Sequence, residues 1–390
     1  MYSYDGKILT PKAVTKEYSV VACDQYTSEP EYWSEISEKT QGVISTYHMV
    51  FPEAYLSGDN TARIKSIEKS MHEAIDCGFF SEFEGVTFVE RVLPNGKTRS
   101  GICLLIDLEQ YSFDPSDKAV IRATEGTIIQ RIPPRVLIRE NAPLEFPHVM
   151  LLFDDENDDV MNFAREIKGD VLYKTDLIGG GGSITGYKIE NTAKLHEKIA
   201  SKAKVSNDST LMFAVGDGNH SLATAKACYE NKKAKGEDAS LARYALCEIV
   251  NIFDDSLEFE PIHRVMLGVD TEKFIEGLKQ FEGDDSISIL VGDKEIEVSV
   301  SADVGLAYTT IQNYIDEFLK ENDGEVDYIH GEDSLRKIVA REAGSVGLFM
   351  KSIKKSTFFA EILANGNYPR KTFSMGEAYE KRYYFEGRRI

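Results

Sequence analysis

The chain has 390 residues, 42% of them hydrophobic, so it can bury a sizeable core in two or three ordinary domains or in one large domain. Its formal net charge of -20 disfavours non-specific nucleic-acid binding, which needs clustered Lys and Arg residues that displace counterions from phosphates. The five cysteines form no CxxC pair, which argues against a zinc knuckle or a disulfide framework. The sequence has no signal-peptide pattern and no apolar run of the ~20 residues that cross a membrane, so we expect a cytoplasmic protein without membrane contacts.

The first half of the chain carries three clear element signals. Apolar residues from Ile64 to Ile75 recur at helical spacing and predict an amphipathic helix over residues 61–80. Two apolar, β-branched runs flank Pro94-Asn95-Gly96 and predict a β-hairpin over residues 86–108, because Asn-Gly accepts the positive φ angles of a tight turn. Residues 191–203 form a further predicted helix.

The middle of the chain predicts a strand, a glycine turn and a helix in direct succession. The apolar run 211–215 predicts a buried strand that leads into Gly216–Ser221 (GDGNHS) and then into a helix over residues 221–235. In such α/β units, ligands often meet the N-terminus of the helix. Residues 242–253 predict another buried element.

The C-terminal third predicts a second α/β unit. Its pattern contains helices over 270–281, 309–321 and 332–342, a hairpin over 287–300, and strands at 326–330 and 346–350. We therefore expect a core α/β domain with the ligand site over residues 1–268 and a smaller C-terminal α/β lobe over 269–390.

The Gly216–Ser221 turn is the first candidate site. Gly216 and Gly218 let the backbone turn sharply, and the free N–H groups of the following helix favour an anion. Asp217 is suited to hold a metal or act as a base, and His220 to donate to a phosphate or move a proton. The alternative is a turn without a ligand in which Asn219 caps the helix.

An arginine-rich segment is the second candidate. Arg122, Glu125 and Thr127 precede Arg131 and Arg135, and arginine forks match phosphate or carboxylate groups. The alternative, which composition alone favours, is a solvated surface segment with salt bridges. Pro133-Pro134 argues against a regular helix before Arg135.

Other motifs are weaker. His263-Arg264 suits an anion, although such a pair is more often structural, and the glycine run 179–182 and the segment 330–333 are weak alone. Nucleophile triads find little support, because no GxSxG motif occurs and no cysteine lies in an activating context.

Taken in order, several segments resemble the domain of unknown function family 1015 of bacteria and archaea. They extend over nearly the whole chain: Cys23–Thr27, Glu31–Trp33, Arg122–Thr127, Gly216–Ser221, Pro261–Arg264, His330-Gly331 and Pro369–Phe373. The turn of that family resembles the D-G-H-H-R element of free serine kinases in the ParB/sulfiredoxin-like group. The resemblance implies a mixed α/β (α+β) fold with a nucleotide-binding core.

The resemblance also implies roles for single residues. Asp217, Gly218 and His220 match the turn that holds nucleotide phosphates in that group. Glu125 and Thr127 match the segment that carries a catalytic glutamate, and His263 and Arg264 match a further family segment. Three positions depart from the family pattern: Thr124 and Asn219 each replace a histidine, and Ser221 replaces an arginine whose loss removes charge-assisted hydrogen bonds to a phosphate.

We therefore expect a small-molecule phosphotransferase that uses ATP or ADP with Mg²⁺, with serine as a candidate acceptor by resemblance alone. The expected catalytic residues are Glu125, Asp217 and His220, and the expected ligand-binding residues are Arg122, Thr127, Arg131, Arg135, Gly216, Gly218, Asn219, Ser221, His263 and Arg264. One alternative is a non-catalytic sensor that binds a nucleotide or small acidic ligand. Another is a ParB-like DNA-associated protein, which the charge and the lack of a helix-turn-helix disfavour.

Overall fold

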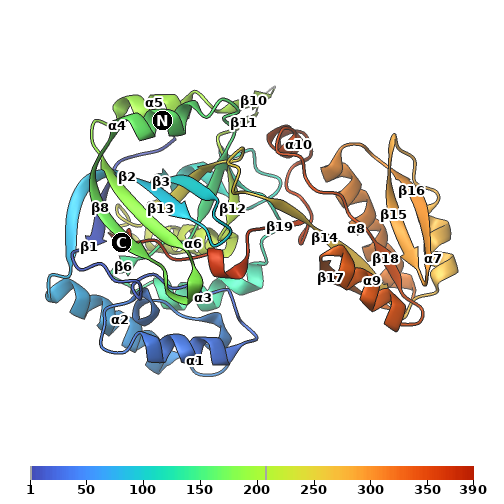
Figure 1. Ribbon diagram of the computed structural model, residues 1–390, viewed down its shortest axis with the longest axis horizontal. Coiled ribbons are helices and arrows are strands. Elements are labelled where there is room, and N and C mark those ends of the chain that lie inside the picture. The colour runs from blue at the N-terminus through green and yellow to red at the C-terminus, as the bar shows by residue number, and fades with distance from the viewer. Residues whose placement is uncertain (1, 207–208) are drawn as a thin grey trace. The chain divides into compact units, whose positions relative to one another are not determined.

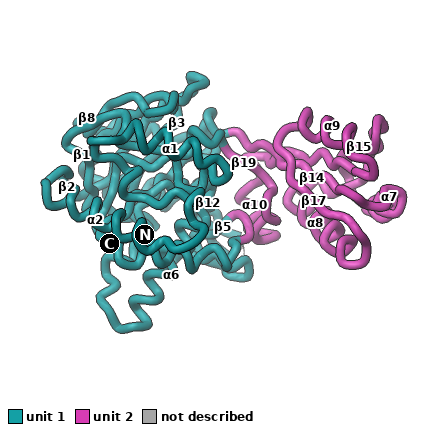
Figure 2. The backbone as a smooth tube through the Cα atoms, turned by 90° about the horizontal axis from the view of Figure 1, so that it is seen from below, with its two compact units in different colours: residues 1–123, 127–257, 376–390 teal, residues 124–126, 258–375 magenta. Residues whose placement is uncertain are grey.

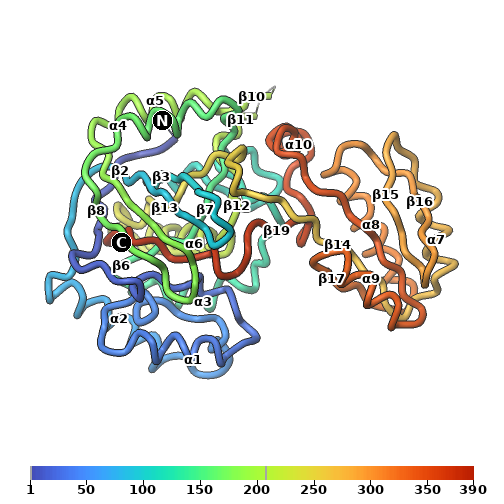
Figure 3. Tube along the Cα trace, viewed as in Figure 1, coloured from blue at the N-terminus to red at the C-terminus, as the bar shows by residue number. Residues whose placement is uncertain are grey.

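The computed structural model describes residues 2–206 and 209–390 (Figure 1). The chain forms two compact units: unit 1 comprises residues 1–123, 127–257 and 376–390, and unit 2 comprises residues 124–126 and 258–375 (Figure 2). Both ends of the chain lie in unit 1 (Figure 3). We expected a domain boundary after residue 268, and that expectation stays a prediction. The chain passes from unit 1 to unit 2 between Leu257 and Glu258.

Unit 1 is built on a mixed sheet that has ten strands among the described residues. The strand order is β4-β5-β12-β7-β13-β3-β2-β9-β8, with β1 beside β2. The pairs β4/β5, β5/β12 and β7/β13 are parallel and the others are antiparallel. The strands are β1 (Gly6–Pro11), β2 (Phe80–Val92), β3 (Thr98–Asp107), β4 (Tyr111–Ser112), β5 (Ile121–Ala123), β7 (Met150–Phe153), β8 (Lys168–Asp176), β9 (Ser183–Ile189), β12 (Phe213–Asp217) and β13 (Tyr244–Asn251).

The sheet of unit 1 buries both of its faces. Along β3, Ile102 and Leu104 join one apolar cluster while Cys103 and Leu105 join another, because successive strand side chains point to opposite faces. Figure 1 shows α4 and α5 on one side of this sheet and α1 and α2 on the other. The helices of unit 1 are α1 (Pro30–Lys39), α2 (Thr61–Asp76), α3 (Ile132–Arg139), α4 (Asp159–Ile167), α5 (Ala193–Ala200) and α6 (Asn219–Lys235).

Unit 1 also contains short elements outside this sheet. Two small strand pairs are β6 (Leu144–Glu145) with β20 (Arg388–Arg389) and β10 (Lys204–Ser206) with β11 (Ser209–Leu211). The 3-10 turns are η1 (Thr46–Met49), η2 (Glu53–Tyr55), η3 (Leu108–Gln110), η4 (Ile129–Arg131), η5 (Ile178–Gly180) and η6 (Ala378–Glu380).

Most of the predicted elements of unit 1 are confirmed, with one correction. The hairpin around Asn95-Gly96 is β2/β3, and the strand–turn–helix unit is β12 followed by α6. The expectation that Pro133-Pro134 would prevent a helix before Arg135 is wrong, because α3 begins at Ile132. The prolines occupy its first turn, where N–H groups have no intrahelical partner, so they cost no helical hydrogen bond.

Unit 2 has a smaller sheet of six strands within the described residues. The order is β16-β15-β18-β14-β17, with β19 beside β14, and the pairs are antiparallel. The predicted hairpin over 287–300 is confirmed as β15/β16. The elements are β14 (Phe259–Leu267), α7 (Thr271–Leu278), β15 (Asp285–Val291), β16 (Lys294–Val300), α8 (Val304–Glu321), β17 (Glu325–His330), α9 (Glu332–Arg341), β18 (Val346–Leu348), α10 (Phe358–Asn365) and β19 (Phe373–Met375). Both units mix strands and helices, so the chain has the expected mixed α/β fold. Within residues 2–206 and 209–390, none of the helices has the length and apolar composition of a membrane span.

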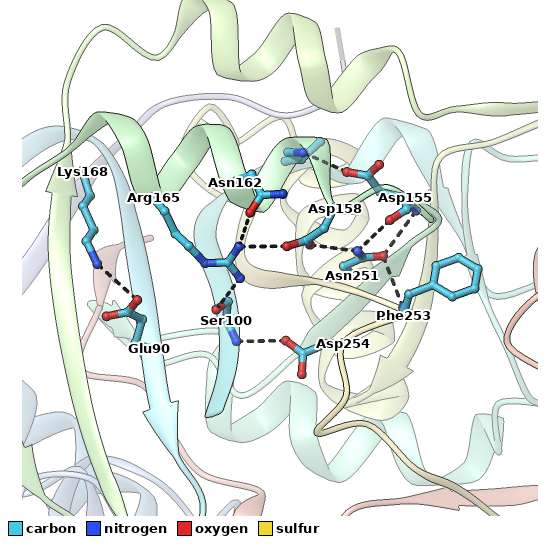
Figure 4. A network of polar contacts seen from close by, with 11 residues as sticks. Glu90, Ser100, Asp155, Asp158, Asn162, Arg165, Lys168, Asn251, Phe253 and Asp254 are labelled. Atoms are coloured by element: carbon cyan, nitrogen blue, oxygen red, sulfur yellow. Dashed lines mark hydrogen bonds and ion pairs between the residues drawn. The ribbon is translucent and has the colours of Figure 1, made fainter. Parts of the chain in front are cut away.

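A polar network in unit 1 fixes the loop between β7 and α4 (Figure 4). Asn251, at the end of β13, donates to the carbonyl oxygen of Asp155 at 2.8 Å and to the carboxylate of Asp158 at 3.0 Å. Arg165 of α4 donates to the same Asp158 carboxylate at 2.8 Å and to the Ser100 hydroxyl at 3.1 Å. The network therefore joins β3, β13 and α4, and its polar groups are used to hold the fold.

Unit 1 also buries a carboxyl group, that of Glu386. Its side chain is fully buried, and the hydroxyl of Tyr173 donates to its Oε1 at 2.7 Å. Its Oε2 has no hydrogen-bond partner among the described residues. Burial raises the pKa of Glu386 to about 7, despite the hydrogen bond from Tyr173, because the ionised form loses the hydration that water would give it.

Candidate functional site

The candidate site lies where β12 passes into α6. Strand β12 ends at Asp217, Gly218 precedes the helix with a φ of 82°, and α6 begins at Asn219. The positive φ at Gly218 favours glycine, and a Cβ atom there would also be tight, at 3.0 Å from the Cα atom of Val149. The predicted sharp turn is therefore present.

The first turn of α6 presents free backbone N–H groups. The N–H groups of Asn219, His220 and Ser221 have no intrahelical partner, and no side chain among the described residues caps them. The alternative that Asn219 caps the helix is wrong, because Asn219 lies inside the helix. Its buried Oδ1 atom has no hydrogen-bond partner within residues 2–206 and 209–390. The first turn of α6 therefore has backbone donors of the kind that bind anions in other proteins.

His220 is held as a neutral donor at this turn. Its Nε2 accepts a hydrogen bond from the backbone N–H of Ile128 at 3.3 Å, so the ring proton of the neutral form lies on Nδ1. Burial, together with the positive charges of Arg135 and Arg131, lowers the pKa of His220 to about 4. At neutral pH the imidazole is therefore uncharged and can donate through Nδ1.

Lys381 brings a positive charge to the turn from the C-terminal segment. Its Nζ lies 3.8 Å from the carboxylate of Asp217, whose Oδ1 also accepts the N–H of Gly218 at 3.0 Å. Burial opposes ionisation of Asp24, but electrostatic interactions with His148 and Lys381 and a hydrogen bond from Gln25 hold the pKa of its carboxyl below the ordinary value. Lys381 thus interacts with two carboxylates.

The pairing of β12 with β7 places His148 next to the same turn. Strand β12 pairs antiparallel with β7, with Asp217 opposite Met150, and this pairing brings the residues before β7 to the start of α6. Nε2 of His148 lies 2.7 Å from Oγ of Ser221. Ser221, which replaces the family arginine, is therefore hydrogen-bonded to a histidine that the sequence analysis did not single out.

The arginines of the second candidate segment differ in their surroundings. The buried Arg122 donates to the carbonyl oxygen of Ala119 at 2.7 Å and also to the hydroxyl of Ser209. Arg135 forms an ion pair with Glu53. Arg131 is exposed at the end of η4. Of these three, Arg131 has the guanidinium most accessible to a ligand, and the binding roles of all three stay predictions.

Thr127 is the remaining predicted residue of this segment. Its Oγ1 is buried and has no hydrogen-bond partner in the described part of the chain. Thr127 precedes Ile128, whose backbone N–H donates to Nε2 of His220. This hydrogen bond holds the segment around Thr127 next to the turn. Its predicted binding role is untested.

Glu125 belongs to unit 2, where backbone N–H groups hold its carboxylate. The N–H groups of Thr372, Lys371 and Phe373 lie 3.0, 3.4 and 3.5 Å from its oxygens. Burial nevertheless raises the pKa of Glu125, and these backbone hydrogen bonds oppose the rise. Glu125 is therefore fixed against the segment that the family resemblance singled out at Pro369–Phe373.

His263 and Arg264 also lie in unit 2, on β14. The fully buried guanidinium of Arg264 stands 4.9 Å from the ring centre of Tyr308 and 5.1 Å from that of Tyr328, and it donates to the carbonyl oxygen of Lys371 at 2.9 Å. Nδ1 of His263 accepts the N–H of Met350 at 3.1 Å. These contacts show that His263 and Arg264 stabilise the structure of unit 2. Their predicted roles in ligand binding stay predictions.

The sequence analysis missed three residues of the turn's surroundings. Asp24 lies in the Cys23–Thr27 block that carries the family resemblance, and this was the available signal for it. His148 and Lys381 have no local motif and reach the turn through strand pairing and through the return of the chain to unit 1. Only the fold brings these residues to Asp217 and Ser221.

Comparisons with solved structures give distant similarities. A conserved hypothetical protein from Pyrococcus furiosus is 10% identical, with a TM-score of 0.38 over 74% of this chain and 94% of that chain. A free serine kinase in complex with AMP is 12% identical, with a TM-score of 0.40 over 72% and 90%. A mutant of a free serine kinase in complex with ADP is 12% identical, with a TM-score of 0.41 over 74% and 93%. No protein with a curated description matches the chain.

A family model covers most of the sequence. The model described as a protein of unknown function (DUF1015) matches residues 7–354, which contain both β14 and the whole of the α6 turn. The resemblance inferred from the ordered segments is thereby confirmed. The chain belongs to the DUF1015 family.

Proposed function

We propose that the chain is a small-molecule phosphotransferase that binds the phosphates of ATP or ADP at the N-terminus of α6. The observation that carries the proposal is the uncapped first turn of α6, which offers the N–H groups of Asn219, His220 and Ser221. Lys381 adds a positive charge beside the turn, and Nδ1 of His220 adds a neutral donor. Together they supply the charge neutralisation on which phosphoryl transfer mainly depends.

Each residue at the turn has a separate part in this proposal. The three N–H groups and Lys381 hold phosphate oxygens, and the exposed Arg131 adds a second positive charge. Asp217 would hold Mg²⁺ together with phosphate oxygens and water, since Mg²⁺ in nucleotide sites is commonly bound through one or two carboxylates. The ion would neutralise charge on the transferred phosphoryl group. Residues 2–206 and 209–390 contain no cluster of three His, Cys, Asp or Glu side chains suited to a metal.

The family resemblance implies that Glu125 is catalytic, and in this proposal, with Asp217 assigned to Mg²⁺, Glu125 deprotonates the acceptor hydroxyl. Its raised pKa favours proton uptake relative to an ordinary glutamate. The acceptor class is a small hydroxyl compound, with serine as a candidate by resemblance alone. Glu125→Gln tests this role separately, because it should abolish transfer and leave nucleotide binding intact.

The first experiment is isothermal titration of the full chain with ATP, ADP and AMP, with and without Mg²⁺. Lys381→Met should weaken ATP binding by roughly 10- to 100-fold in both conditions, since a charge-assisted hydrogen bond contributes roughly 1.5–3 kcal/mol. Asp217→Asn should reduce mainly the Mg²⁺-dependent binding. Asp238→Asn, an exposed aspartate beyond the other end of α6, is the matched control and should bind normally. Absence of saturable binding by all three nucleotides would refute the proposal.

A non-catalytic sensor of a nucleotide or small acidic ligand is the second candidate. It is favoured by Ser221 in place of an arginine and by the engagement of Arg122 with Ala119 and Ser209. Binding of ATP without turnover over hours, in the presence of a panel of hydroxyl acceptors, would favour the sensor. Formation of ADP and a phosphorylated acceptor would favour the enzyme.

A further inference from the structure

Ser221 and His148 open onto a cavity of unit 1 that the proposed phosphate site does not use. The cavity has a volume of about 140 Å³. We propose that Ser221 is a nucleophile activated by His148, and that this cavity takes the short acyl group of a carboxylic ester. The proposal goes beyond phosphoryl transfer and does not depend on nucleotide binding, although it uses the N–H groups of His220 and Ser221 that the proposed function assigns to phosphate, so that an ester and a nucleotide would compete for them.

The geometry of Ser221 and His148 is that of a nucleophile and its base. Oγ of Ser221 lies 2.7 Å from Nε2 of His148, within the range in which a base takes a hydroxyl proton. The imidazole is 5% exposed and packs edge-on against the ring of Tyr383, with 5.1 Å between ring centres and 73° between planes. The ring is thus held in one orientation toward the hydroxyl.

A carboxylate supports the charge that His148 would acquire. Asp24 interacts electrostatically with His148, and the attraction helps to keep Asp24 ionised in spite of its burial. Nδ1 of His148 is buried and has no hydrogen-bond partner among the described residues. The electrostatic attraction between Asp24 and His148 would also stabilise the imidazolium formed during the reaction.

The same helix turn supplies donors for a developing oxyanion. Ser221 is the third residue of α6, so its own N–H and that of His220 are among the groups without an intrahelical partner. A negative oxygen formed next to Oγ of Ser221 would meet these N–H groups and the positive end of the helix dipole. A helix N-terminus, a nucleophile and a base therefore coincide.

The cavity determines the class of substrate. Its wall is mainly apolar, with contributions from Met49, Val50, Phe51, Leu56, Met71 and Phe146, and it includes both Ser221 and His148. The charged wall residues form the ion pairs Arg135–Glu53 and Arg139–Glu145, so they present no unmatched charge to a ligand. A cavity of about 150 Å³ accommodates a benzene-sized group. The expected substrate is an ester with a short, uncharged acyl group.

The reaction balances without a further cofactor. Oγ of Ser221 attacks the carbonyl carbon, and its proton passes to Nε2 of His148. The bond from the carbonyl carbon to the alkoxy oxygen then breaks, and the leaving alcohol takes the proton from Nε2. Water attacks the resulting acyl-serine, again giving its proton to His148, and the acid leaves as Ser221 recovers its hydrogen.

The test is covalent labelling of the full chain with a fluorophosphonate, followed by intact-protein and peptide mass spectrometry. We expect one adduct, on Ser221, which is absent in Ser221→Ala and forms at least 100-fold more slowly in His148→Gln. Ser201→Ala removes an exposed serine at the end of α5 and should label like the unmodified chain. Mapping the adduct to Ser221 in the unmodified chain does not depend on the folding of a variant, whereas the His148→Gln comparison is interpreted only if that variant unfolds at the same temperature as the unmodified chain. No adduct, an adduct elsewhere, or labelling that is insensitive to His148→Gln would overturn the proposal.

A second measurement tests the cavity. Hydrolysis of p-nitrophenyl butyrate should be at least tenfold faster than that of p-nitrophenyl laurate, whose chain exceeds the cavity, and Ser221→Ala should abolish the difference. Equal rates for the two esters would show that the cavity does not take the acyl group. Thermal unfolding of each variant, followed alongside, separates loss of the reaction from loss of the fold.

Discussion

Replacement of Glu386 by glutamine should raise the free energy of unfolding of unit 1, and this increase should become larger as the pH rises. Burial raises the pKa of Glu386 from 4.5 to about 7 in the folded chain. Between these two values the folded chain keeps a proton that the unfolded chain releases, so the stability of the unmodified protein falls as pH rises through this window. Glutamine resembles the protonated carboxyl group and has no such dependence.

The magnitude follows from the two pKa values. The difference of about 2.5, at about 1.4 kcal/mol for each pKa unit, gives about 3.5 kcal/mol once the carboxyl is ionised in both states. Glu386→Gln should therefore raise the free energy of unfolding by about 3 kcal/mol at pH 8 and by about 1 kcal/mol at pH 5. Comparing variant and parent at each pH cancels the contributions of groups that do not change.

The chain contains a suitable probe for this experiment. Its single tryptophan, Trp33, is fully buried in unit 1, so urea unfolding followed by tryptophan fluorescence reports on the unit that holds Glu386. Glu82→Gln, at an exposed position of β2, is the control and should show the same small effect at both pH values. A difference between Glu386→Gln and the parent that is equal at pH 5 and pH 8 would refute the assignment of a raised pKa.

Three further predictions concern the turn and the two units. Gly218→Ala, which forces a side chain into the left-handed region, should cost unit 1 about 1–2 kcal/mol in urea unfolding followed by Trp33 fluorescence and should weaken ATP binding. Since His220 is neutral at pH 6–8, His220→Gln should change ATP affinity by the same factor at pH 6 and pH 8, and a larger factor at pH 6 would show that it is protonated. Arg264→Lys, which loses the guanidinium fork between two tyrosine rings, should cost unit 2 about 2 kcal/mol and raise hydrogen exchange in β14 while leaving β12 unchanged.

The local elements were predictable where neighbouring residues determine the conformation. Asn95-Gly96 specifies its own hairpin, and the apolar run before Gly216 leads directly into the turn and α6. The start of α3 was not predicted, because proline breaks a helix only beyond its first turn, and the sequence pattern did not show where that turn would fall. Local patterns thus predicted which elements exist better than where they begin.

The candidate site was predictable only in part, because some of its contacts join residues that are far apart in the sequence. Gly218 and Asp217 belong to one short motif, so their joint location was visible in the sequence. His148 meets Ser221 because β7 pairs with β12 in one particular register, and Lys381 meets Asp217 because the chain returns to unit 1. Such contacts depend on strand order, which single-residue motifs do not encode. The sequence analysis accordingly found the glycine turn and missed the contact between Ser221 and His148.

The return of residues 376–390 to unit 1 has a consequence for biosynthesis. During synthesis from the N-terminus, Asp217 and Ser221 leave the ribosome long before Lys381 and Tyr383, and all of residues 258–375 emerge in between. A nascent chain that has completed unit 2 still lacks the lysine beside Asp217 and the ring that holds His148. The turn therefore acquires its full set of neighbours only after the whole of unit 2 has been synthesised.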